Sequence, residues 1–257
     1  MMFPISPSIP RAALITGGAQ RIGLAIAQAL AGVGFDVAIH CNASVEAARA
    51  AAAELPTRAV VLQADLADET QSAALIGRAT EALGPIGVLV NNASTFERDE
   101  WHDATRESWD AHIEPNLRAP FVLTQHFAMA LPPAHEGVVI NLLDQRVWSL
   151  TPHFVSYTIS KAGLWALTQS MALALAPRIR VNGIGPGPAL PSPRQTREQF
   201  DKQTRSVPLG RGTSPEEVAR AALAILAMPA MTGQMIALDG GQHLQWASGQ
   251  GFPPPEE

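Results

Sequence analysis

The sequence predicts an α/β fold with one doubly wound domain, in which a parallel sheet of about seven strands carries helices on both faces. Two patterns predict it. Short apolar runs alternate with longer segments whose alanines and leucines recur at helical spacing. The alternation is regular, and strands joined by crossover helices form parallel sheets covered on both sides. We expect one domain over residues 11–248, without an internal linker or repeat.

The strands are expected where the short apolar runs lie, and the helices where the spacing turns helical. The expected strands are Ala12 to Thr16, Asp36 to His40, Ala59 to Leu62, Val88 to Asn91, Val138 to Leu142, Val181 to Ile184 and Gln234 to Leu238. The expected helices are Ile22 to Leu30, Glu46 to Glu54, Thr70 to Leu83, Trp109 to Leu131, Ser160 to Leu175 and Pro215 to Ala227.

Three segments are expected to stay irregular. Residues 185–211 are rich in proline and glycine and follow the carboxyl end of a strand. Irregular stretches of that length are usually functional, so we expect a substrate lid over the crevice. The proline-rich ends, residues 1–10 and 249–257, are expected to be flexible tails.

Composition narrows the class of protein and its partners. Hydrophobic content of 47% and charged content of 16% are typical of a soluble globular protein. A net charge of −5 argues against nucleic acid as a partner. The single cysteine, Cys41, excludes an internal disulfide framework, and the histidines lack metal-ligand spacing, so no metal is expected. Without a signal-like start or an apolar span, we expect no membrane association and a cytoplasmic location.

A glycine-rich turn follows the first expected strand directly. It reads T-G-G-A-Q-R-I-G over Thr16 to Gly23 and leads into a helix. Gly17 and Gly23 allow backbone to approach a pyrophosphate, and the helix directs free N–H groups and its positive dipole end at that anion. Arg21 stands where a third glycine often occurs. Alone such a turn is weak evidence, but its place between strand and helix predicts a Rossmann-type dinucleotide site.

The end of the second strand indicates which dinucleotide binds. It reads H-C-N-A-S, and residues 37–45 contain no carboxylate for ribose hydroxyls. Arg21 and His40 are expected to meet a 2′-phosphate instead, with Asn42 and Ser44 as neutral donors, so NADPH is favoured over NADH. An alternative stays open, in which Arg21 and His40 are ordinary surface residues.

An acid–base constellation lies in the second half of the chain. The only tyrosine, Tyr157, stands four residues before Lys161, and Asp144 stands thirteen residues before Tyr157. A phenol with an ordinary pKa of about 10 is a poor acid at neutral pH, and an ammonium one helical turn away lowers that pKa. Such a pair is also common on helix surfaces, so the neighbouring motifs must decide.

Those motifs resemble the short-chain dehydrogenase/reductase family over residues 11–244. Besides the glycine turn and Y-x-x-x-K, the chain carries N-N-A at Asn91 to Ala93 and Asn116 in N-L-R-A-P-F. Pro186-Gly187 and a D-G-G sequence at Asp239 follow in the same order. The resemblance implies a homotetramer. It also implies that Lys161 orients the ribose and that Asn116 holds a water in a proton relay.

One departure indicates a branch of that family. Asp144 stands where the family usually has serine, and T-G-x-x-x-R-x-G, N-N-A-S-T-F and N-L-L-D accompany it. This combination resembles the pteridine reductases. It implies that Arg21 contacts the cofactor phosphates, that Phe96 stacks a pterin on the nicotinamide and that Ser94 lies beside the cofactor. Asp144 and Tyr157 would then deliver the proton.

The chemistry supports the same assignment. Reduction of a C=N bond needs a hydride on carbon and a proton on nitrogen, from opposite sides of one planar substrate. Asp144 could carry that proton if burial raised its pKa, or accept ring N–H donors when ionised, whereas a serine can only bond a carbonyl oxygen. Phe96 offers an aromatic platform, although plain core packing is the alternative.

The complete expected site follows from the motifs and the resemblance. Asp65 could accept from the adenine amino group or cap the next helix. The expected catalytic residues are Asp144, Tyr157, Lys161 and Asn116. The expected cofactor contacts are Gly17, Arg21, Ile22, Gly23, His40, Asn42, Ser44, Asp65, Leu66, Asn92, Ala93, Ser94, Lys161, Pro186 and Gly187. The expected substrate contacts are Ser94, Phe96, Asp144, Trp148, Tyr157 and Leu190.

Three functions follow from these residues. The first is NADPH-dependent reduction of a pterin, such as biopterin, dihydropterin or dihydrofolate. The second is reduction of a carbonyl compound or 3-oxoacyl thioester, because P-L-G-R-G-T-S-P-E-E-V-A over residues 208–219 occurs throughout the broader family. The third is a dinucleotide sensor without turnover, against which the intact Tyr157 and Lys161 argue.

Overall fold

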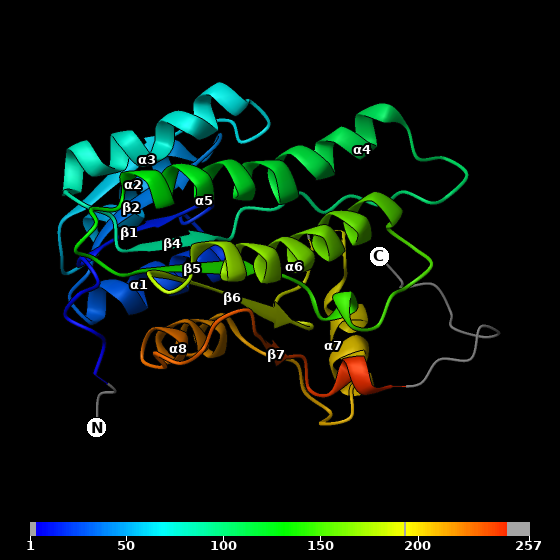
Figure 1. Cartoon of the computed structure of the whole chain (residues 1–257). Coiled ribbons are helices and arrows are strands. Elements are labelled where there is room, and N and C mark those ends of the chain that lie inside the picture. Colours follow the sequence, from blue (N-terminus) through cyan, green and yellow to red (C-terminus); the bar gives the residue numbers. More distant parts are fainter. Residues whose placement is uncertain (1–3, 193, 246–257) are drawn as a thin grey trace.

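Seven parallel strands form one sheet in the order β3-β2-β1-β4-β5-β6-β7 (Figure 1). The computed structural model describes residues 4–192 and 194–245. The strands are β1 (Ala12–Ile15), β2 (Asp36–Cys41), β3 (Ala59–Gln63), β4 (Val88–Asn91), β5 (Gly137–Leu142), β6 (Ile179–Pro186) and β7 (Met235–Leu238). The predicted doubly wound α/β fold with seven parallel strands is confirmed.

Strand β1 is apolar throughout because both faces of the sheet are covered. In β1, Ala13 and Ile15 pack into one hydrophobic cluster, while Ala12 and Leu14 pack into the other. Successive side chains of a strand point to opposite faces, so an unbroken apolar run is what a doubly covered strand requires.

Helices cover the two faces of the sheet. The cluster on one face contains side chains of α1 (Arg21–Gly32), α2 (Val45–Ala53) and α8 (Pro215–Leu226). The cluster on the other face contains side chains of α3 (Glu69–Leu83), α5 (Ala119–Ala130) and α6 (Val155–Leu175). Figure 1 shows α5 and α6 on one side of the strands and α8 on the other. None of the helices within residues 4–192 and 194–245 is long and apolar enough to cross a membrane.

One predicted helix is interrupted. The segment expected as a single helix over residues 109–131 comprises α4 (Arg106–Ile113), a π-helical turn (Glu114–Arg118) and α5. Pro115 and Pro120 lie in this region and have no backbone N–H to donate. The regular ladder of hydrogen bonds therefore shifts to the wider π spacing.

The segment expected to be irregular, residues 185–211, contains a helix, so the prediction is wrong in this part. Helix α7 spans Arg197–Ser206. The Thr196 hydroxyl accepts from the Gln199 backbone N–H, and the Gln199 side chain accepts from the Thr196 N–H. The sequence contains this capping box, but the many prolines and glycines of the segment led to the prediction of an irregular structure.

The amino-terminal segment is partly folded against the body of the protein. Ile9 is buried in a core cluster, and the Ser8 carbonyl accepts from the Glu136 backbone N–H at 3.0 Å. Residues 4–10 therefore differ from the flexible tail expected for residues 1–10. Residues 1–3 and the expected tail over residues 249–257 lie outside the described residues.

The strand order reverses direction between β1 and β4, which are hydrogen-bonded neighbours. Their carboxyl ends lead into the glycine-rich turn and into Asn91 to Ala93. Open α/β sheets bind ligands in the crevice at such a reversal point. The fold therefore brings two of the sequence motifs to one place.

Candidate active site

The glycine-rich turn and the end of β4 are joined by hydrogen bonds. The Asn92 side-chain amide donates to the carbonyls of Thr16 and Gly17 at 2.9 and 3.1 Å. The Thr16 hydroxyl in turn accepts from the backbone N–H groups of Asn92 and Ala93 at 2.9 and 3.0 Å. The expected cofactor contacts Gly17, Asn92 and Ala93 are therefore brought together.

The two expected glycines of this turn occupy positions that disfavour a side chain, Gly17 by its backbone conformation and Gly23 by lack of room. Gly17 adopts a φ of +62°, and a Cβ on Gly23 would lie 2.2 Å from the Gly17 carbonyl oxygen and 2.6 Å from the Asn92 amide nitrogen. Only glycine fits both positions. The resulting bare backbone at the start of α1 fits a dinucleotide pyrophosphate.

His40 is buried beneath the turn, so its expected contact with a 2′-phosphate is wrong. It is 2% exposed. Its Nδ1 accepts from the Gly17 backbone N–H at 3.2 Å, and this assigns the proton to Nε2, which donates to the Ala64 carbonyl at 3.1 Å. Burial lowers the pKa of His40, so the ring is neutral. The His40 side chain therefore stabilises the glycine-rich turn through its hydrogen bond with Gly17.

Arg21 spans from the turn to the segment after β6. Both terminal nitrogens of its guanidinium donate to the Pro191 carbonyl at 3.2 Å. Its φ of +54° is in the left-handed region, which costs a non-glycine residue roughly 1–2 kcal/mol. The structure thus places Arg21 at the edge of the crevice, next to the expected lid.

The remaining expected contacts of the adenosine half lie at the ends of β2 and β3. Asn42 and Ser44 are exposed there, and Ser44 begins α2 without a side-chain cap. The cap alternative for Asp65 is wrong, because Asp68 caps α3 while Asp65 accepts from the Ala67 N–H. The Leu66 side chain packs in the core.

The three expected acid–base residues lie together. The Tyr157 hydroxyl donates to Oδ2 of Asp144 at 3.1 Å. The Lys161 Nζ donates to the Leu142 carbonyl at 2.8 Å and lies 5.8 Å from the centre of the Tyr157 ring. Burial lowers the pKa of Lys161 to about 8, although the nearby Asp144 opposes that change. Two elements, the end of β5 and the first turns of α6, position this group.

Asp144 has a second partner that sequence reasoning missed. The Arg146 backbone N–H donates to Oδ1 at 2.9 Å, and the Arg146 Nε lies 3.3 Å from Oδ2. The side chains of Asp144 and Arg146 are 18% and 15% exposed. The carboxylate accepts the hydrogen bond from the backbone N–H, and its contact with Nε is an ion pair rather than a hydrogen bond.

Phe96 forms part of an aromatic group beside this pair. Its ring stacks on Phe154 with centres 4.7 Å apart, and its edge meets the Tyr157 ring, also at 4.7 Å. Phe154 was not expected here. It precedes α6 with a left-handed φ of +57°, an unusual conformation that often occurs at functional sites. The expected platform is therefore backed by a second ring.

The Asn116 side chain is buried and fully engaged. Its amide nitrogen donates to the Thr95 carbonyl at 2.9 Å and to the Ser160 hydroxyl at 3.1 Å. Its amide oxygen accepts from the Thr95 backbone N–H at 2.8 Å. Asn116 thus fixes the loop that carries Ser94 and Phe96 against α6.

A buried carboxylate anchors the same loop to the start of α6. Asp99 accepts from the Ser156 backbone N–H at 3.2 Å and from the Ser156 hydroxyl at 2.6 Å. Phe154 occupies the N-cap position of α6 and provides no side-chain cap. Asp99, which is distant in the sequence, therefore accepts from a backbone N–H of the first turn that would otherwise lack a partner. His112 lies 2.7 Å from the Ser156 hydroxyl and accepts from the Glu97 N–H, so it is a structural histidine.

The expected lid contacts both sides of the crevice. Arg194 forms an ion pair with Glu97 and donates to the Phe96 carbonyl at 2.9 Å. On the other side, Arg21 holds Pro191 as described above. Leu190, an expected substrate contact, is half-buried in this segment.

Trp148 lies differently from the other expected substrate residues. Its ring packs edge-on against Trp165 and His243, with centres 6.3 and 5.1 Å apart, rather than joining Phe96 and Tyr157. The expected cofactor contacts Pro186 and Gly187 lie at the end of β6, where a Cβ on Gly187 would be 2.7 Å from the Asp239 Cα.

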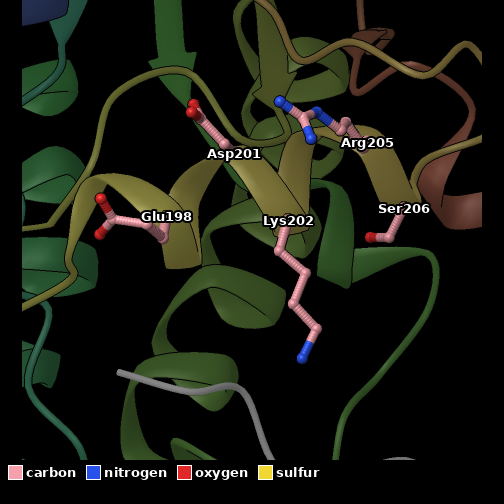
Figure 2. Close-up of a pocket in the computed structure, with 5 residues that line it drawn as sticks. All are labelled: Glu198, Asp201, Lys202, Arg205 and Ser206. Carbon is pink, nitrogen blue, oxygen red and sulfur yellow. The ribbon is translucent and has the colours of Figure 1, made fainter.

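A hollow of about 420 Å³ lies on α7 (Figure 2) and contains none of the expected site residues. The residues that line it are charged or polar and come from this helix alone: Glu198, Asp201, Lys202, Arg205 and Ser206. Within residues 4–192 and 194–245, no three histidine, cysteine or acidic side chains are grouped so that they could hold a metal ion.

The chain is similar in sequence and in fold to known reductases. The family model described as enoyl-(acyl carrier protein) reductase matches residues 17–243. A 3-oxoacyl-(acyl-carrier-protein) reductase, FabG of Staphylococcus aureus, is 30% identical over 242 residues, which are 91% of this chain and 98% of that protein.

Two solved structures are more similar in sequence. FolM alternative dihydrofolate reductase 1 of Brucella canis, complexed with NADP, is 45% identical with a TM-score of 0.88 and covers 93% of this chain and 96% of its own. The Brucella suis protein, also with NADP, is 46% identical with a TM-score of 0.89 and covers 93% and 97%. By this coverage and by its arrangement of glycine turn, tyrosine and lysine, the chain belongs to the short-chain dehydrogenase/reductase family.

Proposed function

We propose that the protein is an NADPH-dependent reductase that transfers hydride to the C=N bond of a pterin. One observation carries the proposal. The Tyr157 hydroxyl and the Asp144 carboxylate are hydrogen-bonded at 3.1 Å, and the Phe96 ring lies against Tyr157. A proton donor, a carboxylate acceptor and a platform for a planar ring thus meet at the carboxyl end of the sheet.

The cofactor supplies the hydride. The residues of the chain bind the cofactor and supply the proton. The bare glycine turn and the start of α1 hold the pyrophosphate. Asn42 and Ser44 are exposed at the end of β2, where the ribose of the adenosine half lies in this fold. NADPH is the cofactor, as in the two Brucella structures that contain NADP.

Tyr157 gives its proton to the substrate nitrogen while hydride reaches the neighbouring carbon. Lys161 supports this step as a buried cation, because the Lys161 pKa of about 8 keeps its ammonium charged at neutral pH. A positive charge near the ring stabilises the phenolate that remains after proton transfer. Asn116 fixes the surrounding loop and, by resemblance to the family, supports a water relay that returns the proton.

The carboxylate distinguishes the pterin reaction from the carbonyl reaction. A carbonyl oxygen gains negative charge during hydride transfer and needs hydrogen-bond donors around it. Asp144 accepts hydrogen bonds in the structure, so it suits a ring nitrogen or amino group better than an oxygen. Reduction of 3-oxoacyl thioesters is the second candidate, because the similarity to FabG of Staphylococcus aureus favours it.

Substrate-dependent oxidation of NADPH separates these functions. The purified protein is tested with dihydrobiopterin, with dihydrofolate and with an acetoacetyl thioester, and loss of reduced nicotinamide is followed. We expect turnover of the pterins. Turnover of the thioester alone would refute the proposal, and tight NADPH binding without any turnover would favour a sensor.

We also propose a homotetramer in the cytoplasm. Large apolar side chains are exposed on α5 and α6, where Met129, Ile159 and Leu173 are 73%, 43% and 84% exposed. Apolar surface on two adjacent long helices favours association between copies. Light scattering of the purified protein tests this, and a monomer mass would contradict it.

A further inference from the structure

Arg146 is the one arginine that contacts the catalytic carboxylate among the described residues. It lies in the 3-10 turn Gln145–Val147 that follows β5, and Asp144 caps that turn. Its backbone N–H donates to one carboxylate oxygen at 2.9 Å, while its Nε lies 3.3 Å from the other. A single residue therefore contacts both oxygens of Asp144.

The Arg146 side chain is also enclosed by the aromatic group. Its guanidinium carbon lies 5.2 Å from the ring centre of Tyr157, 5.4 Å from that of Phe154 and 5.7 Å from that of Phe96. A cation at such distances is attracted to ring faces, and partial burial strengthens this attraction. The guanidinium is thus fixed between the proton donor, the platform and the carboxylate.

We infer that Arg146 is a positioning residue that fixes Asp144 as a hydrogen-bond acceptor and thereby selects substrates whose planar ring edge donates N–H groups. The inference rests on the proposed function, which it makes more specific. A carboxylate paired with a guanidinium accepts hydrogen bonds and donates none. An aminopyrimidine edge, such as that of a pterin, offers N–H donors, whereas a ketone or thioester carbonyl offers an acceptor that the carboxylate repels.

If Asp144 acts only as a hydrogen-bond acceptor, Tyr157 is the single proton donor of the reaction. A hydride from NADPH forms the new C–H bond, the C=N double bond becomes a single bond, and one proton forms the new N–H bond. Tyr157, which donates to Asp144 in the structure, supplies this proton. Asp144 then holds the ring and orients the phenol without itself losing a proton.

The chain contains a matched control for Arg146. The Arg98 guanidinium carbon lies 5.6 Å from the centre of the same Phe154 ring, but Arg98 pairs with Glu100 at 2.8 Å. Removing the Arg98 guanidinium takes a cation away from the Phe154 ring and leaves the ion pair between Arg146 and Asp144 intact. A general loss of packing would appear in both variants, whereas a loss of carboxylate positioning appears only at Arg146.

The test compares Arg146→Met, Arg146→Lys and Arg98→Met with the wild type. We measure kcat and KM for dihydrobiopterin, the Kd of NADPH, and the Kd of 2,4-diaminopteridine for the protein saturated with NADP. Truncating one member of a partly buried charge pair is expected to lower kcat/KM and weaken diaminopteridine binding by about 10- to 100-fold. Arg146→Lys recovers part of that loss, Arg98→Met changes either quantity less than about threefold, and the NADPH Kd stays within about threefold throughout.

Two outcomes overturn the inference. One is an equal loss in Arg146→Met and Arg98→Met, and the other is diaminopteridine binding to Arg146→Met that matches the wild type. Failure of the proposed function is distinct from both. If the wild type reduces no pterin but binds diaminopteridine with the expected dependence on Arg146, the reaction assignment is wrong and the role of Arg146 holds.

Discussion

Replacing Lys161 by methionine should change how the stability of the protein depends on pH. Lys161 is 3% exposed, and burial lowers its pKa from 10.5 to about 8. Below pH 8 the amine is charged in both the folded and the unfolded chain, so the folded state bears the whole desolvation cost. Between the two pKa values the folded chain releases its proton first, and the unfolded chain binds more protons.

The free energy of unfolding must therefore rise with pH across that window. A displacement from 10.5 to about 8 corresponds to about 3 kcal/mol, of which about 2–3 kcal/mol is recovered between pH 7 and pH 10. Methionine has a similar length and no charge, so Lys161→Met lacks this contribution. The difference between the two proteins cancels groups that lie away from Lys161, such as Cys41, whose pKa burial raises. It reports the titration of Lys161 together with that of Tyr157, whose phenolate the Lys161 charge stabilises.

Urea unfolding of both proteins without cofactor, at fixed protein concentration and several pH values, provides the measurement. The wild type is expected to gain stability relative to Lys161→Met as the pH rises from 7 to 10. If the two stabilities run parallel over this range, Lys161 is not a desolvated cation, and its proposed support of the Tyr157 phenolate at neutral pH loses its basis.

Two further predictions concern the cofactor turn and the start of α6. Gly23→Ala is expected to raise the NADPH Kd at least about tenfold, because the new Cβ would lie 2.2 Å from the Gly17 carbonyl oxygen. Gly32→Ala, in the same helix with no heavy atom within 4 Å, should leave calorimetric NADPH binding unchanged, and equal effects of the two would contradict the steric argument. Asp99→Ala removes both carboxylate oxygens, which accept from the Ser156 N–H and the Ser156 hydroxyl, and is expected to lower the free energy of unfolding by about 2 kcal/mol. An unchanged urea midpoint would show that this network does not hold α6.

Local patterns in the sequence predicted the fold and the acid–base pair. Strands such as β1 are buried on both faces, so their apolar runs are unbroken and visible without a structure. Tyr157 and Lys161 meet because a helix brings residues four apart to one face, and this spacing is also local. The tight turn at Gly17 and Gly23 was predictable from these two residues, because Gly17 adopts a positive φ and Gly23 lies too close to neighbouring backbone for a side chain.

Tertiary contacts explain what the sequence did not show. His40 resembles a surface phosphate ligand in sequence, but the neighbouring strands bury it under Gly17. Arg146 lies beside Phe96, which is 50 residues away in the chain, and Arg194 donates to the carbonyl of the same residue across a separation of 98 residues. No periodicity or spacing reports such contacts, because the sheet and the loops after its strands create them.

The Asp144→Ser variant tests the central claim most directly, since it restores the residue that the broader family usually has. The measurement is kcat/KM for dihydrobiopterin set beside the Kd of NADPH, each relative to the wild type. Asp144 contacts Tyr157 and Arg146 after β5, whereas the glycine turn follows β1, so pterin turnover is expected to fall at least about 100-fold while NADPH binding changes less than about threefold. Equal losses in turnover and in NADPH binding would contradict the assignment of Asp144 to the substrate.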